Sequence, residues 1–151
     1  MASGIKADQL RPVVVGAGQV SKASGTLASS AISLFTVAGG EVLITTVYLK
    51  VTTSITTDSA TVALQSVQTA GGTFTLVTAT DLGTTDTVAG AVIGLDQGTT
   101  AASSFLRGGR NDLNAVVTSG VVKLLPSGGN GAVTVYVTWV PLTPGATLVA
   151  A

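Results

Sequence analysis

Apolar and polar residues alternate along most of this chain, most clearly near its end. In residues 133–140 (VTVYVTWV), three valines share one parity with Trp139, and threonine or tyrosine fills most of the other positions. A period of two residues places successive side chains on opposite faces of a β-strand. Pro141 follows at once, and proline suits a strand end because it cannot donate to the ladder. The segment therefore predicts a strand with one apolar face.

This strand lies in a stretch without charged side chains that begins after Lys123. A membrane-spanning helix needs about 20 consecutive apolar residues. Here PSGGNG interrupts the apolar run before the strand, and PLTP interrupts it afterwards. We therefore expect no membrane partner.

Similar runs, bounded by glycine, serine, threonine or aspartate, predict further strands at 31–38, 41–53, 60–69, 73–80, 88–96 and 113–125, the last being one strand or two. Gly39-Gly40 predicts one hairpin, and the turn at 70–72 predicts another. The first half of 41–53 is apolar at both parities, which predicts a central strand covered on each face. The best helical candidate, 21–35, is interrupted by glycine and serines.

Short strands joined by turn residues predict an all-β fold: an antiparallel sandwich, a jelly roll or a small barrel. A length of 151 residues predicts one domain, 1–151. The segments expected to be irregular are 1–11, 16–30, 81–88 and 96–112. Residues 1–25 are predicted to form an extended N-terminal arm.

The composition is unusual in its lack of charge. Charged residues make up 9% of the chain, against about 25% in typical domains, and 24 threonines and 19 glycines take their place. The formal net charge is zero, so copies repel one another weakly and pack together readily. The seven basic residues form no stripe with stacking aromatics, which argues against a nucleic-acid partner.

The chain contains neither cysteine nor histidine. The usual zinc and iron–sulfur sites, disulfides, and cysteine or histidine catalysis are therefore excluded. We expect no cofactor, no metal and no catalytic residue. The N-terminus, MASGIKADQLRP, shows no signal-peptide pattern, which favours the cytoplasm as the site of synthesis and use.

Two motifs come close to binding signatures. VVVGAGQVSK (13–22) begins like a dinucleotide-binding turn, but it lacks the third glycine and the acidic residue about 20 positions on. Asp81, Asp86 and Asp96 offer oxygen ligands for calcium without the alternating spacing of a calcium loop. We interpret them as turn aspartates that bond their own backbone. The acids are too scattered to favour a glycosidase pair.

Two segments resemble the small structural proteins of tailed bacteriophages, of the head decoration or cement type. Residues 33–55 (SLFTVAGGEVLITTVYLKVTTSI) match an early LFTV-GG-VLIT pattern, and 131–151 (GAVTVYVTWVPLTPGATLVAA) match a Y-PL--GA-VVA ending. Here Trp139 stands one place further from the proline than the usual aromatic. The resemblance covers about 45 residues directly, and 60–130 match only in composition.

The resemblance implies a non-enzymatic virion protein on the capsid surface, assembled in the cytoplasm of a bacterial host, that binds the outside of an icosahedral head and stabilises it. Its implied partners are the major capsid protein and copies of itself, commonly as a homotrimer. Candidate contacts with the capsid or a neighbouring subunit are three residues of the arm and two of the loop RGGRND: Lys6, Arg11, Lys22, Arg107 and Arg110.

Two alternatives stay open. A phage tail-tube, tail-fibre or adaptor protein would share this composition and fold class. A carbohydrate-binding or host-recognition module would use exposed aromatics, for which Trp139, Tyr136 and Tyr48 are candidates. Trp139 and Tyr136 have opposite parity, which instead favours one core residue and one that covers the outer face.

Overall fold

The computed structural model describes residues 18–56, 60–82, 87–95 and 113–151. The regular elements in these residues are all β-strands, which confirms the all-β class. They are β1 (Gly18–Thr26), β2 (Ile32–Ala38), β3 (Val42–Thr53), β4 (Thr61–Gln68), β5 (Gly72–Asp81), β6 (Val92–Leu95), β7 (Ala115–Val117), β8 (Gly120–Pro126), β9 (Ala132–Pro141) and β10 (Thr147–Ala150).

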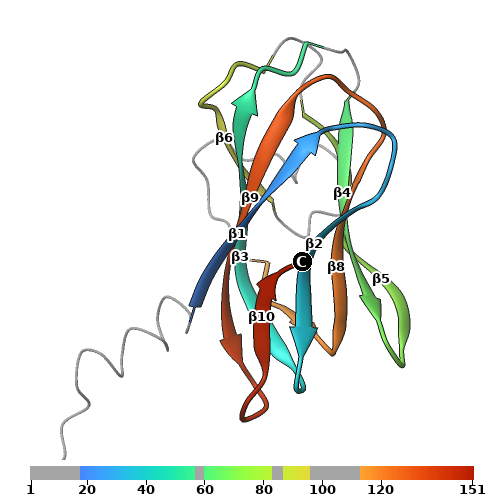
Figure 1. The fold of residues 1–151 in the computed structure, drawn as a ribbon, viewed down its shortest axis with the longest axis vertical. Helices are drawn as coiled ribbons and strands as arrows, with labels where there is room; N and C mark the ends of the chain where they lie inside the picture. The colour runs from blue at the N-terminus through green and yellow to red at the C-terminus, as the bar shows by residue number, and fades with distance from the viewer. Residues whose placement is uncertain (1–17, 57–59, 83–86, 96–112) are drawn as a thin grey trace, which may run out of the picture.

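The strands form two antiparallel sheets. Sheet A has the order β1-β9-β3-β6, and β7 also pairs with β3; sheet B has the order β10-β2-β8-β4-β5. Figure 1 shows the two sheets overlaid as the layers of an elongated molecule. The fold is therefore an antiparallel β-sandwich.

The core lies between the sheets and follows the alternation seen in the sequence. In β9, Val133, Val135 and Val137 are fully buried, whereas the residues between them are half-buried. Phe35 and Leu124 are fully buried from the side of sheet B. Each such side chain contributes about 1.5–3 kcal/mol to folding, so the inner faces hold the two sheets together.

Most connections cross between the sheets. Gly39-Gly40 joins β2 in sheet B to β3 in sheet A, so the hairpin predicted there is wrong. Each of these strands instead pairs with a distant one, β2 with β8 and β3 with β9. The hairpin predicted at 70–72 is confirmed, because β4 and β5 pair directly. The central position of β3 is also confirmed, although its outward side chains stay partly exposed.

The prediction of irregular backbone over 16–30 is wrong for Gly18–Thr26, which forms β1 against β9. Residues 1–17 lie outside the described residues, so the arm stays a prediction there. Segment 113–125 forms two strands, β7 and β8. Leu95 pairs with Val47 of β3, and the Leu113 amide donates to the Thr45 carbonyl of the same strand. The residues on either side of 96–112 are therefore both bonded to β3.

Candidate interaction surface

Four turns gather at one end of the sandwich, at the bottom of Figure 1. They are residues 39–41 between β2 and β3, 69–71 between β4 and β5, 118–119 between β7 and β8, and 142–146 between β9 and β10. We call this surface the four-turn end. Each turn connects strands whose inner faces are in the core, so the positions of the turns are fixed by the packing of the sheets.

The first and last of these turns are bonded together. The Glu41 amide donates to Thr143 Oγ1 at 3.1 Å, and the Leu142 and Thr143 amides donate to the Glu41 carbonyl at 2.9 and 3.2 Å. A Cβ on Gly40 would lie 2.5 Å from Thr143 Cβ, and a Cβ on Gly39 would lie 2.8 Å from the Gly145 carbonyl oxygen. Contacts this close require glycine at both positions.

Hydrogen bonds continue the row to the other two turns. Ser119 Oγ donates to the Gly40 carbonyl at 3.4 Å, and the Thr69 amide donates to the Ser119 carbonyl at 2.9 Å. A Cβ on Gly120 would lie 2.2 Å from the Val67 carbonyl oxygen, so the backbones of β8 and β4 meet closely here. The four turns therefore form one connected and tightly packed plate.

This plate is almost uncharged and presents one large exposed apolar side chain. Leu142 is 48% exposed, and Glu41 is the single charged residue among the turn positions. Beside the plate, Val116, Leu43 and Val140 form a row across β7, β3 and β9 on the outer face of sheet A. Such a surface offers apolar contact and main-chain hydrogen-bonding groups to a partner.

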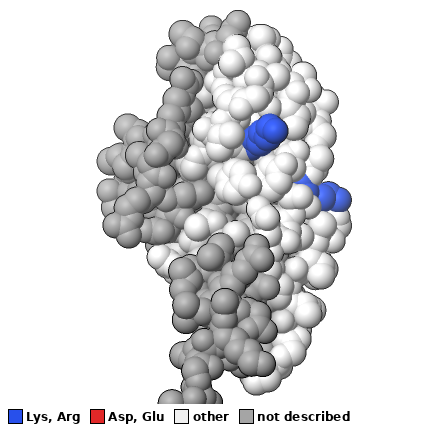
Figure 2. Space-filling model, turned by 90° about the vertical axis from the view of Figure 1, so that its left-hand side faces the viewer, with Lys and Arg blue, Asp and Glu red and all other residues white. Residues whose placement is uncertain are grey.

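Charge is also sparse elsewhere on the described surface. Figure 2 shows isolated blue groups and no red on one lateral side of the described residues. Lys22 is half-buried on β1, and its ammonium donates to the main-chain oxygen of Ala151 at 2.5 Å. Lys22 thus joins the edge of sheet A to the end of β10 within its own chain, and its predicted role as an intermolecular contact stays a prediction.

The other four predicted contact residues, Lys6, Arg11, Arg107 and Arg110, lie outside the described residues. Their role also stays a prediction.

The aromatic residues divide as their parity predicts. Tyr48 and Tyr136 lie on the outer face of sheet A and stack with ring centroids 4.8 Å apart and planes 5° apart. Gln19 Nε2 donates to the Tyr48 hydroxyl at 3.3 Å. Trp139 instead packs against the core, and a Cβ on Gly18 would lie 2.8 Å from its Nε1. One face of each tyrosine ring is covered by the other ring, which leaves less aromatic surface for a sugar.

Of the aspartates considered for calcium, Asp81 lies at the end of β5, and Asp86 and Asp96 lie outside the described residues. Within the described ranges, no group of three His, Cys, Asp or Glu side chains is placed to hold a metal ion. The same ranges contain no helix long and apolar enough to cross a membrane.

The sequence marks individual turns, through Gly39-Gly40 and through Pro141 and Pro144 at and after the end of β9, but it does not show that these turns meet. Comparison with protein-family models, with curated proteins and with solved structures finds no match.

Proposed function

We propose that the protein is a non-enzymatic virion component, a decoration or cement protein that binds the outer surface of an icosahedral phage head and stabilises it. It would be assembled in the cytoplasm of the bacterial host. Its partners would be the major capsid protein and copies of itself, with which it would form a homotrimer on the shell. The four-turn end is the surface that we assign to the capsid.

The observation that carries this proposal is the meeting of the two resembling segments. The AGG turn belongs to the first segment and the PLTPGA turn to the second, about 100 residues later. In the fold these turns share three hydrogen bonds, all of which involve Glu41. Because the two resembling segments meet on one continuous surface, they support a shared binding role more strongly than two resembling segments far apart in the fold would.

The strand order supports the same class of protein. Strands β1, β9, β3 and β6 in one sheet and β2, β8, β4 and β5 in the other follow the order of an eight-stranded jelly roll, with β7 added beside β3 and β10 beside β2. We propose that the sandwich is a jelly roll in this sense. Viral capsid proteins and lectins both use this architecture.

The surface chemistry favours the capsid over the sugar. The plate of turns is tightly packed where Gly39 and Gly40 meet the β9–β10 turn, since a Cβ at either position would lie within 2.8 Å of a neighbouring atom, and a rigid surface loses little conformational entropy on binding. Repeated over a shell, many weak contacts of this kind give strong overall attachment. The mutual stacking of Tyr48 and Tyr136 gives the carbohydrate alternative no comparable support.

The test is co-sedimentation of the purified protein with empty expanded heads of the phage that encodes it. We expect saturable binding at a fixed ratio to the capsid protein. The variant Leu142→Glu should weaken binding at least about 10-fold, because it places a charge in an apolar contact. Val92→Glu is the matched control, since Val92 is 53% exposed on β6, away from the four-turn end, and it should bind normally.

Failure of the wild-type protein to bind heads would overturn the proposal. Binding to isolated tails instead would favour the tail or adaptor alternative. Equal binding by Leu142→Glu and Val92→Glu would keep the head as partner but remove the four-turn end as the contact surface.

A further inference from the structure

The strands at the edges of the two sheets differ in how well they are protected against pairing with another chain. The outer edge of a sheet carries unpaired N–H and C=O groups, and proteins protect such edges with short strands, inward-facing charges or bulges. In sheet A, β6 and β7 have four and three residues, and β10 in sheet B has four. β1 has nine residues, but Lys22 lies on its inward parity. These edges all carry a protective feature.

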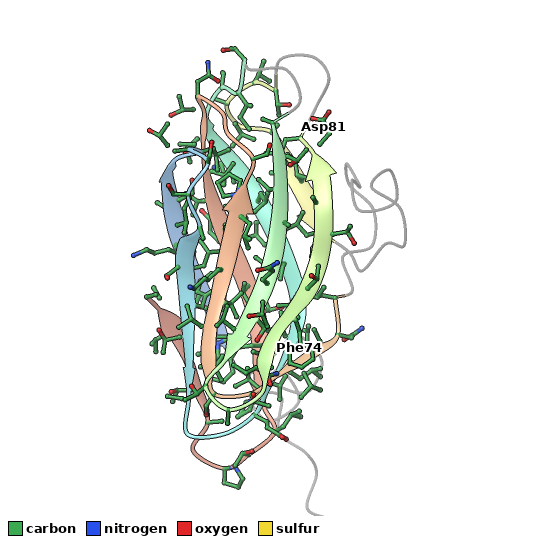
Figure 3. All side chains as sticks on the ribbon, turned by 90° about the vertical axis from the view of Figure 1, so that its right-hand side faces the viewer. Phe74 and Asp81 are labelled. Atoms are coloured by element: carbon green, nitrogen blue, oxygen red, sulfur yellow. The ribbon has the colours of Figure 1, made fainter. Side chains whose placement is uncertain are left out.

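β5, the other edge of sheet B, differs from them over its first half. It has ten residues, no proline, and no charged residue before Asp81. Its ladder to β4 is regular over Gly72–Thr75, and the register shifts lie beyond Thr75. All four of these residues are exposed, and Phe74 is 51% exposed. Figure 3 shows Phe74 near one end of β5 and Asp81 near the other.

We propose that the Gly72–Thr75 segment of β5 pairs with the same segment of a second copy, antiparallel, about a two-fold axis. This pairing extends sheet B across two molecules. It brings the two Phe74 rings close to the axis, where each loses part of its exposed surface.

The direction of the strands favours this arrangement. Sheet B has five antiparallel strands, so β10 and β5 at its two edges run in the same direction. In a head-to-tail contact, β5 of one copy would pair with β10 of the next, and the two strands would run parallel. A parallel ladder is slightly less stable than an antiparallel one. A two-fold contact pairs β5 with itself in the antiparallel sense and closes after two copies.

The charges also favour a second copy as the occupant. Gly72–Thr75 carries no charge, and the formal net charge of the chain is zero. Two copies therefore approach without repulsion, whereas a basic or acidic peptide strand finds no complementary charge on this segment. Threonine and phenylalanine both favour strand conformation, which suits the segment to pairing.

This contact goes beyond the proposed function and does not depend on it. The homotrimer proposed for the shell uses three-fold positions, and a two-fold β5 contact would link copies on neighbouring positions. Pairing is therefore tested with the purified chain alone, without capsids.

The experiment is sedimentation equilibrium over a range of protein concentrations. We expect the wild-type protein to approach twice the chain mass of 14.8 kDa. Phe74→Lys should raise the dissociation constant at least about 100-fold, because a two-fold pair loses two buried rings and gains two facing charges. Val149→Lys is the matched control, since Val149 is 52% exposed on β10 at the opposite edge, and it should remain a dimer.

A second variant, Thr75→Lys, places the charge at the neighbouring position and should also give a monomer. Circular dichroism melts of all three variants establish that each is folded. A wild-type protein that stays monomeric up to its solubility limit would overturn the proposal. So would a dimer or trimer that persists in both folded β5 variants.

Discussion

The contact between the β2–β3 and β9–β10 turns predicts different effects for two glycines with nearly the same φ angle. Gly39 and Gly145 have φ values of +76° and +83°. A Cβ on Gly145 meets no atom of the described residues within 4 Å, whereas a Cβ on Gly39 lies 2.8 Å from the Gly145 carbonyl oxygen. Alanine at either position meets the same unfavourable conformation, but only Gly39→Ala presses the two turns apart.

The magnitudes follow from these contacts. Alanine in the left-handed region costs about 1–2 kcal/mol, and the entropy that alanine removes from the unfolded chain is the same for both variants. For Gly39→Ala the opposing backbone must also move by about 0.6 Å to restore ordinary contact at 3.4 Å, and such crowding adds about 1–3 kcal/mol. We therefore expect Gly39→Ala to be the less stable variant by about 2 kcal/mol.

Urea unfolding followed by circular dichroism measures this difference. With a slope of about 2 kcal/mol per molar urea, the midpoint of Gly39→Ala should lie about 1 M below that of Gly145→Ala. Coincident midpoints would refute the reasoning, because they would mean that the turns are not held in contact. Unequal slopes would make the midpoints incomparable, so the slopes must first be shown to agree.

Three further predictions concern the interior and the turns. Ser66 Oγ is buried and has no hydrogen-bond partner among the described residues, whereas Thr87 Oγ1 donates to the Leu82 carbonyl at 2.7 Å. Ser66→Ala should therefore raise the stability by about 1 kcal/mol and Thr87→Val should lower it by about 1–2 kcal/mol; melting temperatures that shift in the same direction would contradict this. Gly120→Ala, which drives a Cβ toward the Val67 carbonyl oxygen, should cost at least about 3 kcal/mol, and an unchanged urea midpoint would argue against it. Addition of excess calcium or EDTA should leave the melting temperature unchanged, whereas a rise with calcium would restore the calcium site as a hypothesis.

The strands most easily predicted are those in which burial and periodicity agree. In β9 the valines of one parity are all fully buried, so the alternating pattern is also the pattern of the core. β1 escapes prediction because it lies at the edge of sheet A and buries little, with Val20 as its one large apolar side chain. Its conformation is stabilised by the ladder with β9, which no local pattern of residues 18–26 can reveal.

The candidate surface escapes prediction for a related reason. Gly39-Gly40 signals a turn, but whether the following strand returns to the same sheet or crosses to the other depends on the partners of β2 and β3. The contact of Glu41 with Thr143 joins positions 102 residues apart. The sequence predicts that such turns exist, and only the packing of the sheets decides which of them meet.

The pairing of β1 with β9 has a consequence for how the chain folds. Gly18 lies opposite Trp139, and β9 also stands between β1 and β3. During synthesis, β1 and β3 leave the ribosome long before the strand that must separate them, so sheet A cannot be completed until β9 has been synthesised. Folding dominated by such distant pairings takes milliseconds to seconds. The apolar inner faces of the early strands therefore stay without their native partners until β9 arrives.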